Sequence, residues 1–239
     1  MDETFFQIEK LTTGYGDIQV LWGIDLILFQ GEITCLVGSN GAGKSTLLRC
    51  ISGILPPFQG RICFKGKDLS HAAPDQVLEA GIAHVPEGRR LFSAMSVKNN
   101  LLMGAYLRKE RPEAIQKDLD FVFRLFPILA ERMRQNAGTL SGGEQQMCAI
   151  ARGIMSRPEL LMIDELSLGL APLVVERLSE ALLNVNQTGI SILLVEQDVS
   201  IAFELAQRGF VLESGRVILS GPTEELSQNP MVQEAYMGI

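Results

Sequence analysis

Residues 38–46, GSNGAGKST, constrain the fold more than any other stretch, because they fit the phosphate-binding pattern GxxxxGK[ST]. The apolar residues 32–37 before them are predicted to form a short strand, and residues 46–52 after them a helix. In this context the glycines let successive N–H groups point at one anion, and the helix start adds positive dipole charge. A glycine-rich turn without a ligand is the competing interpretation, which the flanking strand and helix disfavour. The sequence therefore predicts a nucleotide phosphate cradle made of Gly38, Ser39, Asn40, Gly41, Ala42, Gly43, Lys44, Ser45 and Thr46.

Two carboxylates end a second apolar segment, residues 160–165 (LLMIDE), which is predicted to be a buried strand. Asp164 is a candidate to hold Mg²⁺, directly or through water, opposite the Ser45 hydroxyl. Lys44 would reach the β and γ phosphates, and Glu165 is the candidate to orient and deprotonate an attacking water. The alternative is that both acids are ordinary solvated residues at a strand end, and their place in the chain after a phosphate loop favours the catalytic interpretation.

Residues 140–146, LSGGEQQ, are predicted to open a helix that runs to about residue 156. A serine cap followed by small residues exposes backbone N–H groups at a helix start, so Ser141, Gly142 and Gly143 form a candidate second anion site. The alternative is a well-capped helix that binds nothing. Two anion sites suit two nucleotides, or one nucleotide shared between two chains.

Two further residues stand where they could contact a nucleotide. Tyr15 falls in a predicted turn at residues 12–16, from which its ring could stack on an adenine or simply pack against the protein. Gln197 follows a predicted strand at residues 190–195, and a side chain at a strand end beside the phosphate site can sense the γ phosphate. Otherwise Gln197 is a loop residue.

Composition excludes several classes of protein. The 239 residues carry a net charge of −7 without a run of Lys or Arg, which argues against a nucleic-acid surface. A hydrophobic content of 46% is enough for the buried core of one domain. The first ten residues lack the basic and apolar segments of a signal peptide, and no apolar run approaches the roughly 18 residues of a membrane span. We therefore expect a cytosolic protein unless a partner holds it at a membrane.

The cysteines do not indicate a metal site. Cys35, Cys50, Cys63 and Cys148 are scattered without CxxC spacing, and only His71 and His84 could assist them. Buried, reduced thiols are the favoured interpretation.

The remaining segments alternate between strands and helices, as expected of an α/β chain. From about residue 96 to 135, helix follows helix, with Ser96 as a possible cap and with Pro112 and Pro127 as helix starts. Another helix starts at Pro172 and turns Val174, Leu178, Ala181, Leu182 and Val185 to the core. Strands are also predicted at residues 5–11, 23–29, 60–64 and 82–85, and a helix at 74–81; a hairpin at 209–219 and a helical tail from Thr223 follow.

Taken together, the phosphate loop, LSGGEQQ and LLMIDE resemble the ATP-binding subunit of an ABC transporter over nearly the whole chain. The resemblance implies an α/β P-loop NTPase fold with an ABC ATPase core, a small antiparallel β subdomain and an inserted helical subdomain at about residues 94–156, within one domain of residues 1–239. It implies that Tyr15 stacks on adenine. It also implies a head-to-tail dimer in which Ser141, Gly142 and Gly143 of one chain close over the ATP of the other.

Three positions depart from the general pattern of that family. Glu87 stands where the family usually has a glutamine; it could still bind Mg²⁺ but carries a charge. Leu166 replaces a common proline, and Gln197 stands in place of the switch histidine, so it can donate a hydrogen bond but cannot become cationic. Catalysis would therefore be slower or depend more strongly on Glu165.

These departures, with VPEGRRLF, SLGLAP and LLVEQ, resemble one branch of the family, the second ATPase subunit of branched-chain amino-acid uptake systems. That resemblance implies ATP and Mg²⁺ as ligands and a place on the inner face of the cell membrane. It implies two membrane permease subunits, a second ATPase subunit, alike or unlike, and an external binding protein as partners, with no nucleic acid. Branched-chain amino acids are the usual cargo of this branch, and related systems move amides or urea. The transported molecule contacts the permease and the binding protein rather than this chain.

Two other classes of function compete with transport. A soluble ABC ATPase acting on DNA is disfavoured, because DNA-repair members carry long coiled coils before LSGG, whereas here Lys44 and Ser141 are 97 positions apart (141 − 44). The ribosome-acting type usually joins two ATPase domains, and one is predicted here. A P-loop kinase would leave LSGGEQQ without a role.

Overall fold

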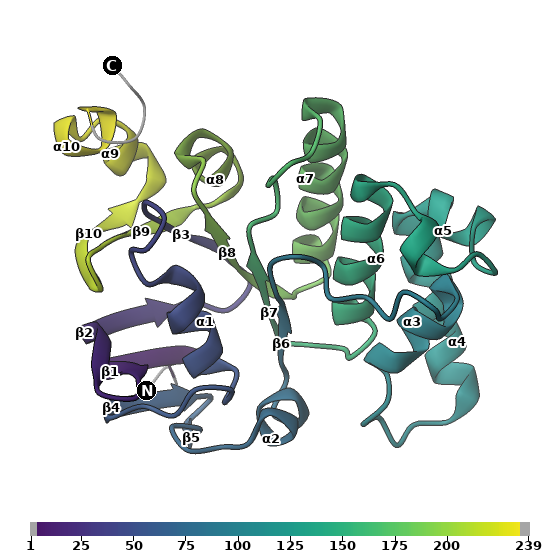
Figure 1. Ribbon diagram of the computed structural model, residues 1–239, viewed down its shortest axis with the longest axis horizontal. Coiled ribbons are helices and arrows are strands. Elements are labelled where there is room, and N and C mark those ends of the chain that lie inside the picture. Colours follow the sequence, from purple (N-terminus) through teal and green to yellow (C-terminus); the bar gives the residue numbers. More distant parts are fainter. Residues whose placement is uncertain (1–3, 235–239) are drawn as a thin grey trace.

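The computed structural model describes residues 4–234 and has a six-stranded sheet at its centre, in the order β10-β9-β3-β8-β7-β6 (Figure 1). The neighbours from β9 to β6 run parallel, and β10 is antiparallel to β9. This α/β sheet confirms the predicted fold class. The strands are β3 (Ile33–Val37), β6 (Ile82–Val85), β7 (Leu160–Asp164), β8 (Ser191–Glu196), β9 (Arg208–Glu213) and β10 (Arg216–Pro222).

Both faces of this sheet are covered, which explains why its central strands are apolar without alternation. Every residue of β3 and of β7 is buried. Successive side chains of a strand point to opposite faces. Ile33 and Cys35 accordingly pack into one hydrophobic cluster, and Leu36 packs into another. A parallel strand buried on both faces requires such a continuous apolar run.

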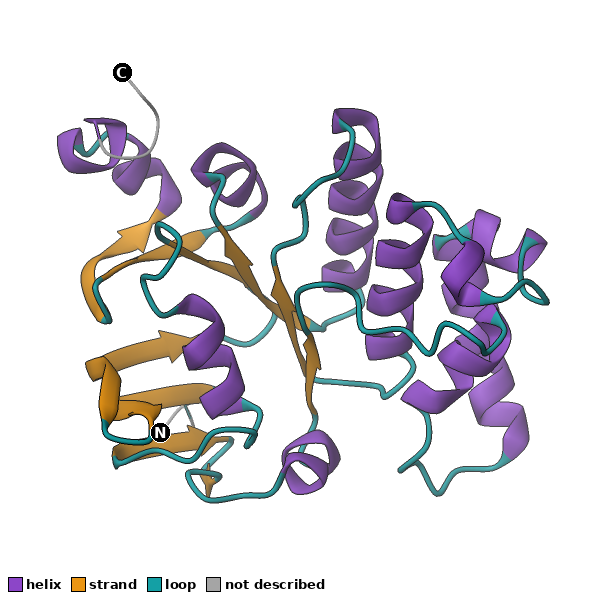
Figure 2. Cartoon of the chain, in the orientation of Figure 1, coloured by secondary structure: helices purple, strands orange, loops and turns teal. Residues whose placement is uncertain are grey.

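The helices divide between the two faces of the sheet (Figure 2). On the side of the small N-terminal sheet lie α1 (Lys44–Ile51) and α2 (Pro74–Glu79). On the other side lie α6 (Gly142–Ile154), α7 (Pro172–Gln187) and α8 (Val199–Leu205). The division places the start of α1 and the start of α6 on different faces of the same sheet.

Between β6 and β7 the chain is largely helical. α3 (Val97–Gly104), α4 (Pro112–Leu125) and α5 (Pro127–Glu131) precede α6 and share its hydrophobic cluster. Ser96 caps α3 by accepting a hydrogen bond from the Asn99 N–H, as predicted. That residues 94–156 act as a separate subdomain stays a prediction.

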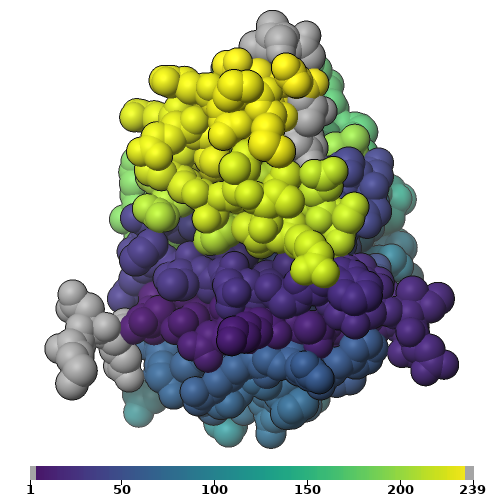
Figure 3. Space-filling view, turned by 90° about the vertical axis from the view of Figure 1, so that its left-hand side faces the viewer, coloured from purple at the N-terminus to yellow at the C-terminus, as the bar shows by residue number. Residues whose placement is uncertain are grey.

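A small antiparallel sheet, in the order β2-β1-β4-β5, lies beside α1. Figure 3 shows its strands, in purple and blue, below the yellow C-terminal part of the chain. The Trp22 N–H donates to the Gly215 carbonyl oxygen at 2.9 Å and joins the two regions. The strands are β1 (Phe6–Tyr15), β2 (Ile18–Leu28), β4 (Gln59–Phe64) and β5 (Lys67–Asp68).

The predicted turn at residues 12–16 is wrong, because β1 continues to Tyr15 and the turn lies at Gly16 and Asp17. Thr12 and Thr13 pair with β2 across register shifts, which keep the strand going where the sequence suggests a break. β2 likewise starts at Ile18, earlier than predicted.

Two other elements differ from the predictions. α8 is not among the predicted helices; it begins directly after Asp198, whose side chain accepts hydrogen bonds from the Ser200 and Ile201 N–H groups. On α7 the buried face contains Val175, while Val174 is only half buried. The helical tail is confirmed as α9 (Thr223–Ser227) and α10 (Pro230–Val232).

The cysteines are free thiols, of which Cys35, Cys50 and Cys148 are buried and Cys63 is half buried. Within residues 4–234, no three His, Cys, Asp or Glu side chains gather as metal ligands would. None of the helices in the described part of the chain combines the length and apolar character needed to cross a membrane.

His84 makes the fold sensitive to acid. Its ring on β6 lies 3.2 Å from the Ser52 hydroxyl, and burial, aided by the charge of Arg49, lowers the pKa of His84 to about 4. The unfolded chain takes up this proton near pH 6.5, so the free energy of unfolding falls as the pH drops from 6.5 toward 4. Between pH 7.5 and 5 we expect this group to cost about 2 kcal/mol.

Urea unfolding of the wild type and of His84→Gln at both pH values measures this effect. The amide has no such proton to gain and can still bond Ser52, so the variant should lose about 2 kcal/mol less than the wild type on acidification. An equal loss in both proteins would contradict the assignment.

Candidate functional site

The phosphate loop joins β3 to α1, and its backbone turns sharply at glycines. Gly43 has φ = 107°, which a residue with a side chain adopts only with strain. A Cβ on Gly38 would lie 2.2 Å from the Leu212 carbonyl oxygen, so no larger residue fits there. No side chain caps the start of α1, so the N–H groups of its first turn are available to an anion.

Lys44 is held inside this loop. Its side chain is 6% exposed, and its ammonium group donates to the Gly38 carbonyl oxygen at 2.7 Å. The same ammonium lies 3.3 Å from a carboxylate oxygen of Glu165, whose side chain is 9% exposed. The cation and the carboxylate therefore form a buried ion pair at the place where a terminal phosphate would compete for the cation.

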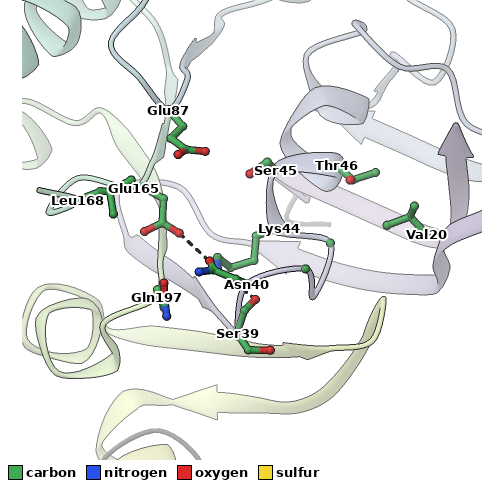
Figure 4. A pocket seen from close by; sticks show the side chains of 12 residues that line it. Val20, Ser39, Asn40, Lys44, Ser45, Thr46, Glu87, Glu165, Leu168 and Gln197 are labelled. Atoms are coloured by element: carbon green, nitrogen blue, oxygen red, sulfur yellow. Dashed lines mark hydrogen bonds and ion pairs between the residues drawn. The ribbon is translucent and has the colours of Figure 1, made fainter.

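The polar side chains that follow the parallel strands meet at one edge of the sheet. Glu87 follows β6, Glu165 follows β7, Gln197 follows β8, and the phosphate loop follows β3. Figure 4 shows the first three facing Lys44 and Ser45 across a cavity of about 400 Å³. Ligands of open α/β sheets bind in this crevice outside the carboxyl ends of the strands. The lining residues are Val20, Ser39, Asn40, Gly41, Gly43, Lys44, Ser45, Thr46, Glu87, Glu165, Leu168 and Gln197.

Glu165 leaves the strand through an unusual backbone conformation. β7 ends at Asp164, and Glu165 has φ = 57°, in the left-handed region that residues other than glycine seldom adopt. Its N–H donates to the Val195 carbonyl oxygen of β8 at 2.9 Å, which fixes the turn. This turn aims the carboxylate at Lys44.

Asp164, the last residue of β7, is 3% exposed and is not among the residues that line the cavity. Its Oδ1 has no hydrogen-bond partner among the described residues. Burial raises the pKa of Asp164 to about 6; the Ser45 hydroxyl and Lys44 act against this rise, and Glu165 and Glu87 add to it. A hard divalent cation would satisfy such a carboxylate, because these cations prefer oxygen ligands.

Tyr15 ends β1 at the edge of the phosphate loop, outside the residues that line the cavity. Its hydroxyl accepts a hydrogen bond from Arg49 at 2.7 Å and lies 3.4 Å from the Thr46 hydroxyl. The residue is 43% exposed. The ring is therefore held in orientation by its hydroxyl and remains accessible to a ligand.

The second predicted anion site, the start of α6, is not part of this cavity: Ser141, Gly142 and Gly143 do not line it. Ser141 caps the helix by accepting from the Glu144 N–H, and the Glu144 carboxylate accepts from the Ser141 N–H. Arg89 lies close by, with its guanidinium 3.2 Å from where a Cβ of Gly142 would be. The start of α6 is thus a capped helix end with Arg89 close by, and it is separate from the phosphate loop of its own chain.

Four residues at or near these sites are not among the site residues predicted from the sequence. Val20 and Leu168 line the cavity, Arg89 flanks the start of α6, and Glu196 is buried directly before Gln197. Three of them stand in segments that carry the resemblance to the branch: Arg89 in VPEGRRLF, Leu168 in SLGLAP and Glu196 in LLVEQ. Val20 stands in none of these segments, and the fold alone brings it to the cavity.

The chain resembles known proteins over nearly its whole length. The family model described as ABC transporter matches residues 21–167. The high-affinity branched-chain amino acid transport ATP-binding protein BraG of Pseudomonas aeruginosa is 43% identical, over 96% of this chain and 98% of that protein. The probable branched-chain amino acid transport ATP-binding protein LivF of Archaeoglobus fulgidus is 34% identical, over 96% and 97%.

Solved structures agree with these matches. A nucleotide-free ATP-binding cassette from an ABC transporter superposes with a TM-score of 0.87 at 25% identity, and the match covers 99% of this chain and 100% of that one. The similarity in sequence extends over the phosphate loop, the start of α6 and the end of β7, and the similarity in fold covers both sheets. The cavity at the sheet edge is therefore that of an ATP-hydrolysing enzyme, and the chain belongs to the ABC transporter family.

Proposed function

We propose that this chain is the ATP-hydrolysing subunit of an importer of branched-chain amino acids. The observation that carries the proposal is the pairing of Lys44 and Glu165 across a phosphate cradle, in a chain whose relatives are branched-chain amino acid transport ATP-binding proteins. An importer of amides or urea is the alternative within the same branch, and a soluble ATPase without a permease is the alternative outside it.

The buried ion pair suggests how ATP binding prepares hydrolysis. The N–H groups of the phosphate loop bind the phosphates, and Lys44 moves its charge from Glu165 to the phosphate oxygens. The freed Glu165 carboxylate orients a water and accepts its proton while the water oxygen bonds to the γ phosphorus. The bond from that phosphorus to the β–γ bridging oxygen breaks, and ADP takes the electron pair.

The oxygen ligands at the cavity fit Mg²⁺. Asp164 has a buried oxygen without a partner among the described residues, and Ser45 and Glu87, which both act on its pKa, line the cavity. These are the groups that magnesium binds. When bound, the ion would neutralise charge on the β and γ phosphates.

Gln197 is proposed to sense the γ phosphate. It lines the cavity directly after β8, on the same side as Glu165 (Figure 4). Its amide can donate a hydrogen bond to a phosphate oxygen. It cannot supply positive charge, so charge neutralisation falls to Lys44 and the metal ion.

Tyr15 is proposed to stack on the adenine. We expect Tyr15→Ala to weaken ATP binding by about 10-fold, because loss of a base-stacking contact costs about 1–3 kcal/mol. Tyr15→Phe, which keeps the ring and loses the contact with Arg49, serves as the matched control and should retain most of the affinity. Titration with a fluorescent ATP analogue measures both variants, and equal affinities for the alanine variant and the wild type would refute stacking.

The separation of the two anion sites supports a head-to-tail dimer. One chain carries an uncapped phosphate loop at the start of α1 and a separate helix start at α6. If two ATPase subunits face each other, the phosphate loop of one can lie opposite the start of α6 of the other. Ser141, Gly142 and Gly143 would then close over the ATP of a second ATPase subunit, either an identical copy or an unlike one. The dimer would carry ATP at the interface.

Two permease subunits are proposed to bind beside the helical region. A groove of about 540 Å³ lies between the loop that follows Glu87 and the end of α3. Phe92 is 49% exposed and Tyr106 76% exposed along it. Large exposed apolar side chains of this kind mark protein interfaces. In this arrangement the subunit would lie on the inner face of the cell membrane, and an external binding protein would deliver the substrate.

Co-purification tests the proposal. The tagged full-length chain is isolated from detergent-solubilised membranes of its native cell, beside a Tyr106→Asp variant that should keep ATP binding and lose the permeases. Two permeases and a second ATPase in the wild-type sample support the transporter, and a ligand screen of the associated binding protein then separates branched-chain amino acids from amides and urea. Recovery only with soluble, ribosomal or DNA-bound partners would refute transport.

A further inference from the structure

Glu196 is a buried acid that the mechanism above does not use. It is the last residue of β8, which lies between β3 and β7 in the middle of the sheet, and its exposed fraction is 0%. Burying a carboxylate costs free energy unless hydrogen bonds compensate it. The partners of Glu196 therefore indicate what it does.

Both carboxylate oxygens of Glu196 bind one residue. Oε1 accepts from the Ser167 N–H at 2.9 Å, and Oε2 lies 3.0 Å from the Ser167 hydroxyl, which donates to it. Burial raises the pKa of Glu196 to about 7; the two bonds from Ser167 oppose this rise, and the charge of Glu165 adds to it. Either protonation state can keep two hydrogen bonds, because the serine hydroxyl can donate or accept.

Ser167 belongs to an irregular segment that the buried side chain of Leu166 also anchors to the core. Residues 165–170 between β7 and α7 contain neither helix nor strand, and the segment includes Glu165 and the cavity-lining Leu168. The bond from the Glu165 N–H to the Val195 carbonyl oxygen fastens its first residue to β8. The hydrogen bonds between Ser167 and Glu196 attach the segment to β8 at a second point, two residues after Glu165.

The same end of β8 carries Gln197 into the cavity. The buried contact between Glu196 and Ser167 thus links the strand end that carries Gln197 to the segment after Glu165. We propose that Glu196 is a positioning residue for ATP hydrolysis, which sets Glu165 and Leu168 relative to Gln197 by holding Ser167. This inference rests on the proposed roles of Glu165 and Gln197, but its test leaves both residues in place.

The test compares Glu196→Ala, Glu196→Gln and Ser167→Ala in the full-length chain, with Glu165 intact. A displacement of about 1 Å in a catalytic group can cost 10²-fold in rate, so Glu196→Ala should lower kcat by about 10-fold or more with little change in ATP affinity. Glu196→Gln should recover most of this loss, because its amide can accept from the N–H and donate to the hydroxyl. A role in core stability alone would lower the melting temperature without this split between kcat and KM.

The double variant Glu196→Ala/Ser167→Ala isolates the contact itself. If the pair acts as a unit, the double variant should be about as slow as Glu196→Ala alone, because coupled residues are not additive. Multiplicative losses would refute the coupling, and a folded Glu196→Ala with wild-type kcat would overturn the proposal. A Glu196→Gln as slow as the alanine variant would also overturn it, since charge rather than the contact would then matter.

Glu213 supplies the matched control. It ends β9 at the same edge of the sheet, is exposed, and takes part in none of the side-chain hydrogen bonds of the described residues. Glu213→Ala should leave kcat unchanged. Failure of Glu165 as the base would appear as normal hydrolysis in Glu165→Gln, an outcome independent of the Glu196 series.

Discussion

In dimers of this chain, Glu165→Gln is expected to lower kcat for ATP by about 10²–10⁴-fold, the range that a general base contributes. The amide has nearly the shape of the carboxylate and can remain near Lys44, but it cannot accept the proton of the attacking water. The phosphate loop is untouched, so ATP affinity should stay close to that of the wild type. Single-turnover hydrolysis and ATP titration separate the two quantities.

The same substitution should make an ATP-bound dimer accumulate, because nucleotide still enters and is not consumed. Size-exclusion chromatography with and without MgATP detects it. Glu204→Gln on α8, an exposed acid outside the cavity, is the control and should hydrolyse ATP normally. Near-normal turnover by Glu165→Gln would remove Glu165 from the mechanism.

In dimers of this chain, Ser141→Arg is expected to lower hydrolysis by about 100-fold or more while the phosphate loop of the same chain still binds ATP. Ser141 does not line that cavity, so its loss acts only where the start of α6 meets a nucleotide held by another subunit. Loss of the helix cap itself costs only about 1 kcal/mol. Melting temperatures of Ser141→Arg and Ser141→Ala check that both variants fold.

Mixing two inactive variants distinguishes a shared site from a site within one chain. In a mixed dimer of Ser141→Arg and Glu165→Gln, one ATP site carries both defects and the other carries none. An equal mixture of subunits that form dimers of this chain should regain about one quarter of the wild-type rate, because half the dimers are mixed. If the natural partner is an unlike ATPase, each variant is instead assembled with that subunit. Ser141→Arg should then inactivate only the ATP site of the partner, and Glu165→Gln only the ATP site of this chain. No recovery in dimers of this chain would refute the head-to-tail arrangement.

Much of the fold was predictable because its signals are local. The apolar runs of β3 and β7 indicate strands buried on both faces, and Pro112, Pro127 and Pro172 mark helix starts that the structure contains. The end of β1 was not predictable, because Thr13 and Gly14 suggest a turn and only pairing with β2 keeps them extended. α8 is short, and its signal is essentially the Asp198 cap.

In the candidate site, too, residues with a local sequence pattern were predictable, and contacts between distant segments were not. The phosphate loop is one continuous stretch and the two acids at the end of β7 are neighbours in sequence, so a local pattern marks each of them. The Lys44–Glu165 ion pair and the Glu196–Ser167 contact join segments that only the parallel order of β3, β8 and β7 brings side by side. No local residue pattern in these segments predicts the order of the strands in the sheet.

The strained backbone of Glu165 is retained together with its buried ion pair to Lys44. A residue with a side chain costs roughly 1 kcal/mol or more at φ = 57°, and glycine does not. Glycine there would relieve this strain, but it would remove the proposed base and leave the buried Lys44 ammonium without its carboxylate partner. Selection for heat resistance alone should therefore not enrich Glu165→Gly, because an unpaired buried charge costs about 3–5 kcal/mol, more than the strain that is relieved.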